Sequence, residues 1–375
     1  MTAFAFRAFG LFLGLLASWS CSDDSESAAD AMNPPGLMEG STETTLSRTQ
    51  PGPWQWVDDP EVRSASDTPS GYALRVGSDP GLLVVYMEEG GACFNAQTCA
   101  LADNLDGYDA AKFNAEFVES GLGERGVFST TSASNPLRGA NFVFIPYTTG
   151  DVFAGTRPAA SAAAYNFVGH ANVGQALERA ASDFPNLTRV LVTGSSAGAC
   201  GTYLNFEAVR ARFPSATVHL LSDSCPLLPN LPPALQARWR STWGIAALPQ
   251  GCSQCIKANG GGLEELPSYL ASQNPASRFA LVSSDRDAIM TAFFSFCHNG
   301  NSCNTLTLPD LVTNAIPFAQ GLGQMRQNLS TAHPNWNFCT FANDTEHIHL
   351  LDGFESKACD SGELLRDFVA RIVEP

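Results

Sequence analysis

Ser196 is the residue whose surroundings most clearly suggest covalent chemistry. It stands at the centre of the motif GSSAG over residues 194–198, directly after an apolar run over residues 189–193. A helical pattern follows from residue 199 to residue 213. Strand, Gly-x-Ser-x-Gly and helix in this order are typical of a nucleophile elbow, a sharp turn that needs very small neighbours around the serine. We therefore predict that Ser196 is a nucleophile; the alternative is a glycine-rich loop before an ordinary helix.

A histidine must accompany Ser196, because a serine hydroxyl is a poor nucleophile near neutral pH without a base in hydrogen-bond reach. Among the six histidines, His347 and His349 lie in a loop after the last predicted strand, residues 336–342. Their alternation places them on opposite sides of an extended segment, so that one of the two can face Ser196. The residues alone leave this choice open, and we interpret the other four histidines as surface or core residues.

A carboxylate is needed to orient this base and to stabilise its protonated form. Asp285 and Asp287 both follow the strand predicted over residues 278–283, and Asp223 follows the preceding strand. Asp151 lies in a glycine-rich turn, where an aspartate more often bonds its own backbone. The order nucleophile, acid, histidine, each just past a strand, is that of the α/β-hydrolases.

The N–H groups expected to stabilise an oxyanion come from two loops. An apolar run over residues 81–87 predicts a buried strand, and Gly90 and Gly91 follow it closely. In α/β-hydrolases this early loop and the residue after the nucleophile supply the oxyanion hole. We therefore expect the donors to be Gly91 or Ala92, together with Ala197. For the loop taken alone, a plain turn is the simpler interpretation.

Strand-like and helix-like segments alternate along most of the chain. This alternation predicts an α/β fold, α/β-hydrolase-like, with a mostly parallel central sheet and helices on both faces. Residues 230–275 are interrupted by proline and glycine, and we interpret them as a disulfide-bonded cap over the sheet. The other segments that support this fold are strands over residues 140–147 and 217–221 and helices over residues 173–184, 288–296 and 362–373.

The N-terminal residues predict export. Residues 1–20 combine Arg7 with a short apolar core, as in a signal peptide, and Cys21 follows directly, as in a bacterial lipoprotein. Residues 21–52 are rich in small and polar residues and are interpreted as a flexible tether, followed by a catalytic domain over residues 53–375. We expect a monomer that is either secreted or held at the bacterial cell envelope by a membrane tether through Cys21.

The charge and the cysteines limit the partners further. A formal net charge of −16 argues against nucleic acid as a partner, and it would also repel a polyanionic substrate at low salt. We expect no cofactor and no metal. A zinc site at Cys252 and Cys255 is the weaker interpretation, because no second pair of suitably spaced ligands accompanies them.

The cysteine count predicts a disulfide framework. Eleven cysteines are present, and ten remain when Cys21 is set aside for lipidation. An even number in an exported chain favours complete pairing. The five short-range pairs that we expect are Cys93–Cys99, Cys200–Cys225, Cys252–Cys255, Cys297–Cys303 and Cys339–Cys359.

Five segments of the chain together resemble the pectin acetylesterase and Notum family of serine esterases, most closely its bacterial members. They are EGGAC (89–93), FIPYTTGD (144–151), GSSAGA (194–199), SDS (222–224) and EHI (346–348). The resemblance implies an α/β-hydrolase fold over residues 53–375 with Ser196 as nucleophile. It further implies Asp287 as the acid and His347 as the base, with Asp285 and His349 as second choices.

The same resemblance implies a serine carboxylic-ester hydrolase that removes short, acetyl-like acyl groups from a polysaccharide. The negative charge disfavours polygalacturonate and leaves a neutral glycan or a lipid ester as alternatives. Ala92 stands where the family often has an aromatic residue, and Met290 stands where a glutamine is common. A peptidase that uses the same triad and a non-catalytic surface-binding lipoprotein are the remaining alternatives.

Overall fold

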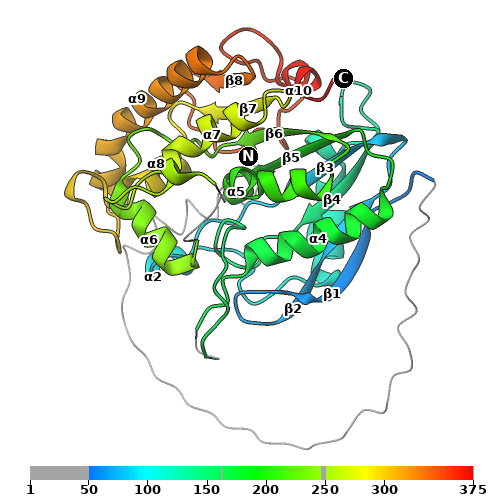
Figure 1. Ribbon diagram of the computed structural model, residues 1–375, viewed down its shortest axis with the longest axis horizontal. Coiled ribbons are helices and arrows are strands. Elements are labelled where there is room, and N and C mark those ends of the chain that lie inside the picture. The colour runs from blue at the N-terminus through cyan, green and yellow to red at the C-terminus, as the bar shows by residue number, and fades with distance from the viewer. Residues whose placement is uncertain (1–49, 162–163, 246–250, 375) are drawn as a thin grey trace, which may run out of the picture.

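An eight-stranded sheet forms the centre of the computed structural model, which describes residues 50–161, 164–245 and 251–374 (Figure 1). The strands are β1 (Gln55–Arg63), β2 (Pro69–Arg75), β3 (Asp79–Met87), β4 (Ala140–Ile145), β5 (Arg189–Ser195), β6 (Thr217–Asp223), β7 (Phe279–Ser284) and β8 (Trp336–Phe341). Their order across the sheet is β1-β2-β4-β3-β5-β6-β7-β8. β2 runs antiparallel to β1 and β4, and all further neighbours are parallel. The prediction of a mostly parallel sheet is confirmed.

Helices cover both faces of this sheet, again as predicted. They are α2 (Ala96–Cys99), α3 (Ala110–Phe113), α4 (Gly169–Asp183), α5 (Ala197–Arg212), α6 (Pro233–Trp243), α7 (Leu266–Gln273), α8 (Ala288–Ser295), α9 (Leu308–Ala332) and α10 (Leu365–Val373). Figure 1 shows α4 and α5 lying side by side across the near face of the sheet. Because side chains of a strand alternate between faces, Val85 of β3 packs with these two helices while Val84 packs with α10.

Several elements were not predicted from the sequence, among them β1, β2 and the long helix α9. β1 and β2 lie at one edge of the sheet, and α9 packs against α8. In the segment over residues 230–275 that we interpreted as a cap, the described residues form α6, short 3-10 turns and α7. The domain limits themselves stay a prediction.

All five predicted disulfides are confirmed. The bonded pairs are Cys93–Cys99, Cys200–Cys225, Cys252–Cys255, Cys297–Cys303 and Cys339–Cys359. Cys252 and Cys255 are bonded to each other, so their thiols are not available as zinc ligands.

The expected signal peptide, Cys21 and nearly all of the expected tether fall within residues 1–49, which lie outside the described residues. Within the described part of the chain, none of the helices is both long and apolar enough to cross a membrane.

Candidate active site

Ser196 lies at the sharp turn between β5 and α5, as the motif predicts. Its backbone angles, φ 52° and ψ −114°, fall outside the regions that non-glycine residues favour. A Cβ atom on Gly194 or Gly198 would lie 2.4 or 2.0 Å from the carbonyl oxygen of Met87, so only glycine fits at these two positions. The turn is further held by Asp223, whose carbonyl accepts a hydrogen bond from the Ser196 N–H at 2.8 Å.

His347, whose side chain is 13% exposed, is paired with the fully buried Asp287. The Nδ1–H of His347 donates to both carboxylate oxygens of Asp287, at 2.8 Å to Oδ2 and 3.0 Å to Oδ1. Asp287 is fully buried and caps α8, where its Oδ1 also accepts from the N–H of Met290 at 2.8 Å. Because the carboxylate fixes the proton on Nδ1, Nε2 is left as an acceptor. Nε2 is buried and has no partner among the described residues.

The alternative residues take other places. His349 is fully buried; its Nδ1 accepts from Lys357 at 3.0 Å, and its Nε2 lies 3.1 Å from the hydroxyl of Ser284. Burial, with the positive charge of Lys357, lowers the pKa of His349 to about 3, so it stays neutral. Asp285 does not contact His347 within the described residues; one of its carboxylate oxygens is buried and unpartnered. The geometry therefore brings together His347 and Asp287.

Asp223 connects the serine turn to the loop of His347. Its Oδ2 accepts hydrogen bonds from the Ser195 hydroxyl at 2.9 Å and from the N–H groups of His349 and Leu350 at 2.9 and 3.0 Å. The side chain is completely buried, and burial raises its pKa to about 6 against these hydrogen bonds. Asp223 thus braces the two loops without contacting the imidazole, a role that its position in the sequence did not indicate.

The charges around His347 favour its protonated form. Burial alone lowers the pKa of His347, but the carboxylate of Asp287, followed by those of Asp223 and Glu89, raises it by more. The net result is a pKa above the ordinary value. Burial also raises the pKa of Glu89 to about 7, so this neighbouring carboxyl group titrates near neutral pH.

The N–H groups expected to stabilise an oxyanion belong to residues that line the same pocket as Ser196. Gly91, Ala92 and Ala197 line the same pocket as Ser196, and no hydrogen bond joins their N–H groups to another described residue. Gly91 has φ +83°, which favours glycine, and Ala197 is the first residue of α5. A helix N-terminus carries partial positive charge, so this arrangement suits a developing oxyanion.

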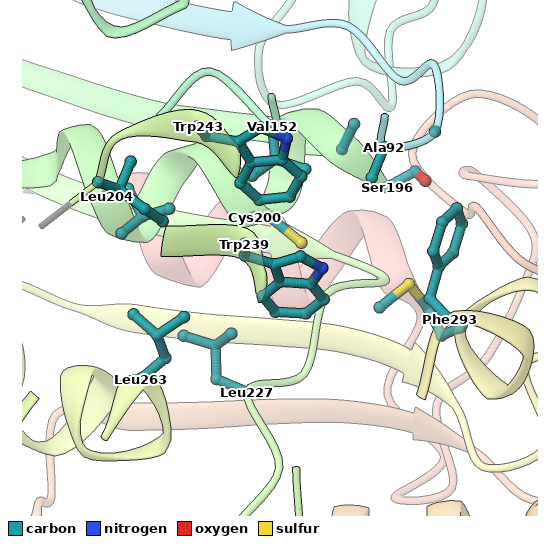
Figure 2. A pocket seen from close by; sticks show the side chains of 14 residues that line it. Ala92, Val152, Ser196, Cys200, Leu204, Leu227, Trp239, Trp243, Leu263 and Phe293 are labelled. Carbon is teal, nitrogen blue, oxygen red and sulfur yellow. The ribbon is translucent and has the colours of Figure 1, made fainter. Parts of the chain in front are cut away.

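The pocket beside Ser196 is apolar. Figure 2 shows Ser196 next to Ala92 and Phe293 at one end of the pocket, with Leu204 and Leu263 at the other. Trp239 and Trp243, one turn apart on α6, stack with ring centroids 5.7 Å apart and form part of the wall. The further apolar side chains of the lining include Val152, Leu227, Ile245 and Met290. These apolar side chains were not predicted from the sequence, although two tryptophans at helical spacing could have indicated an apolar wall.

Asp151 is fully buried and accepts from the Thr149 hydroxyl at 2.6 Å and the N–H groups of Gly169 and Phe153 at 2.8 and 3.1 Å, so it joins its own loop to the start of α4.

The hydrogen bonds of the described residues do not include one between the Ser196 hydroxyl and His347. Such contacts are often long before substrate binds.

Comparison with known proteins decides the family. The family model described as pectinacetylesterase matches residues 58–261, more than half of the chain. The chain belongs to the pectinacetylesterase family. The matched range contains Ser196 and Asp223 and ends before Asp287 and His347, so the comparison does not reach this pair.

Curated relatives of this pectinacetylesterase family member are palmitoleoyl-protein carboxylesterases. The notum1a protein of Danio rerio is 28% identical over 41% of this chain and 31% of its own length. The notum1 protein of Xenopus laevis is 29% identical over 43% of this chain and 34% of its own length. The NOTUM protein of Homo sapiens is 28% identical over 44% of this chain and 34% of its own length. The alignments thus span about a third of these relatives.

Proposed function

We propose that this protein is a carboxylic-ester hydrolase in which Ser196 is the nucleophile, His347 the general base and Asp287 the residue that orients it. The observation that carries the proposal is the His347–Asp287 pair, in which Nε2 of His347 has no partner among the described residues. Ser196, Asp287 and His347 also follow β5, β7 and β8 in the chain order of the α/β-hydrolases. Family membership and the strained serine turn support the same chemistry.

In the proposed reaction, the Ser196 hydroxyl attacks the acyl carbonyl and its proton passes to Nε2 of His347. The oxyanion accepts hydrogen bonds from Ala197 and from Gly91 or Ala92. His347 then protonates the leaving alcohol, and the acyl group remains on Ser196. A water molecule attacks this acyl-enzyme and gives a proton to His347; the carboxylic acid leaves and Ser196 regains its proton.

The apolar pocket supports an acyl group longer than acetyl. The sequence favoured short acyl groups on a polysaccharide, with a lipid ester as the alternative. A polar sugar would leave its hydroxyl groups without partners against Trp239, Trp243 and Leu227, whereas an alkyl chain would gain about 0.8 kcal/mol for each buried methylene group. We therefore place the acyl chain in the pocket and the alcohol part outside it. The relatives named as palmitoleoyl-protein carboxylesterases agree with this choice.

We further propose that the protein is exported. Five disulfides support folding in an oxidising compartment, as predicted from the N-terminal residues. The tether through Cys21 and the monomeric state remain predictions.

The test is ester hydrolysis by the wild-type protein and by Ser196→Ala, with p-nitrophenyl esters from acetate to palmitate. We expect turnover by the wild type, a preference for chains longer than acetyl, and no turnover by a folded Ser196→Ala variant. Covalent labelling by a fluorophosphonate should map to Ser196. Retained turnover in the variant would contradict the serine mechanism. Matched amide substrates test the peptidase alternative, and we expect them to be cleaved far more slowly than the esters.

A further inference from the structure

One lysine holds the loop that carries His347. This segment over residues 342–350, hereafter the histidine loop, follows β8. Lys357 Nζ donates to Asp344 Oδ2 at 2.6 Å, to Glu346 and to His349 Nδ1 at 3.0 Å. These three side chains flank His347 on both sides in the sequence. All three donor positions of the ammonium are therefore used on one loop.

This ammonium is more constrained than an ordinary surface lysine. Its side chain is 20% exposed, and Nζ lies 4.2 Å from the centroid of the Phe341 ring at the end of β8. Burial raises the pKa of Asp344, but Lys357 and nearby N–H groups lower it by more, so this carboxylate stays ionised. Isolated surface pairs contribute little, whereas several charges in one network contribute more.

The backbone of Lys357 is anchored independently of the histidine loop. Its N–H donates to the carbonyl of Gly353, and its carbonyl accepts from the N–H of Leu365, both at 2.9 Å. Two residues further on, Cys359 is bonded to Cys339 of β8. The backbone that carries the ammonium is thus fixed to the sheet and to the start of α10. From this position the ammonium can restrain the histidine loop, which has no regular secondary structure.

The same loop is held from its other side by Asp223, which accepts from the N–H groups of His349 and Leu350. A third contact comes from the loop of Asp287: the N–H groups of Arg286 and Ala288 donate to the carbonyls of Asp344 and Thr345, at 3.0 and 3.3 Å. These contacts hold the backbone, whereas Lys357 neutralises the acidic side chains of the loop.

Asp344, Glu346 and His349 would also suit a metal ion, since their ligand atoms lie within 4.8 Å of one another. The Lys357 ammonium donates to all three, so the chain supplies its own cation there.

We propose that Lys357 is a positioning residue for His347, because its ammonium draws together the three side chains around it and keeps the imidazole aimed at Ser196. The proposal rests on the proposed function. Without the ammonium, two unbalanced carboxylates would repel each other beside the imidazole, and His347 would sample orientations that do not reach Ser196. Misplacement by an ångström costs about 100-fold in rate.

The test compares Lys357→Met with Lys257→Met. Lys257 is a matched control, because it also pairs with two carboxylates, Glu264 at 2.7 Å and Glu265 at 2.6 Å, but on residues 257–265 instead of the histidine loop. On p-nitrophenyl esters we expect Lys357→Met to lower kcat about 10- to 100-fold with little change in KM, and Lys257→Met to change kcat less than about twofold. Equal effects of the two substitutions would overturn the proposal.

A second readout does not depend on activity. The His347 Nδ1 proton, held by Asp287, should give a downfield proton resonance that His347→Gln removes. We expect this resonance to broaden or move in Lys357→Met, to persist in Lys257→Met, and to return in Lys357→Arg. A resonance unchanged in folded Lys357→Met would overturn the proposal even if activity fell. A wild type without esterase activity would contradict the proposed function alone, since the resonance still reports how the imidazole is held.

Discussion

The two sides of Ser196 are built in opposite ways. On one side lie the histidine loop and Asp287, where carboxylates, backbone N–H groups and an ammonium are joined by hydrogen bonds. On the other side lies the apolar pocket, walled by Trp239, Trp243 and Phe293 and containing hardly any polar atom besides the serine hydroxyl. Figure 2 shows how these rings surround the space next to Ser196.

This difference separates two tasks. A base must be held in one orientation, and a hydrogen-bonded network gives direction because its geometry is strict. An acyl chain needs no fixed direction, and apolar burial is roughly proportional to area. We therefore expect substitutions on the polar side to change kcat for every ester, and substitutions on the apolar side to change the ranking of esters. The following predictions test this division.

The largest loss is expected at the pair formed by His347 and Asp287. Asp287→Asn keeps the shape of the side chain but removes the charge that fixes the proton on Nδ1 of His347. We expect kcat to fall about 10,000-fold on both short and long esters, with the fold retained. Steady-state kinetics on the two substrates measures this. Asp285→Asn is the matched control and should retain activity within about threefold, because the hydrogen bonds of His347 among the described residues go to Asp287 and not to Asp285.

A smaller loss is expected at Asp223, which acts through other residues. In Asp223→Asn an amide oxygen replaces the carboxylate that accepts from Ser195, His349 and Leu350. We expect kcat to fall about 10- to 100-fold and the free energy of unfolding to fall by about 1.5–3 kcal/mol. Denaturant unfolding and kinetics measure the two effects. A lower free energy of unfolding with unchanged kcat would show that the hydrogen bonds of Asp223 do not help to position His347.

On the apolar side, Ala92→Trp should alter selectivity. Ala92 lines the pocket next to Ser196, so a large ring there would shorten the space for the acyl chain. We expect the ratio of kcat/KM for octanoate to that for acetate esters to fall about 10- to 200-fold, while acetate hydrolysis is retained. Ala133→Trp, on a loop outside the pocket lining, serves as the control. An equal loss for both esters would contradict the division of tasks.

The smallest expected effect is a shift in the pH at which activity is lost on the acid side of the pH profile. In the proposed reaction His347 must be neutral to accept the proton of Ser196, and its pKa is raised above the ordinary value of about 6.5. Activity should therefore disappear as the pH falls through this raised pKa, with the inflection of kcat/KM above 6.5. In Glu89→Gln a carboxylate that raises the pKa of His347 is removed, so the inflection should move to lower pH. A shift to higher pH would contradict this electrostatic assignment.

The parallel strands of the sheet could be predicted because each is recognisable from its own residues. β3, β5 and β6 contain apolar runs that end at small or polar residues, and the serine motif indicates the turn after β5. The cysteine pairs were predictable because each joins residues no more than 25 positions apart in the sequence. β1 and β2 were missed because their polar residues alternate weakly with apolar ones; their strand conformation depends on pairing with each other and with β4.

The choice between His347 and His349 could not be made from alternation, which shows only that the two differ. It required the positions of two other residues. Asp287, which binds His347, lies 60 residues before it, and Lys357, which binds His349, lies 8 residues after it. The brace at Asp223 likewise depends on hydrogen bonds across 126 and 127 residues. The apolar pocket is assembled from several elements, so its composition follows from the packing of α6 and α8 rather than from one motif.

The bond between Cys339 and Cys359 has a consequence for maturation. These cysteines enclose the whole histidine loop together with Lys357, so the base and the cation that restrains it lie within one covalent ring. A reduced chain would lack this ring, and noncovalent contacts alone would then hold the histidine loop in place. We expect newly made protein to remain a poor esterase until it is oxidised, which would spare the interior of the producing cell from its hydrolytic activity.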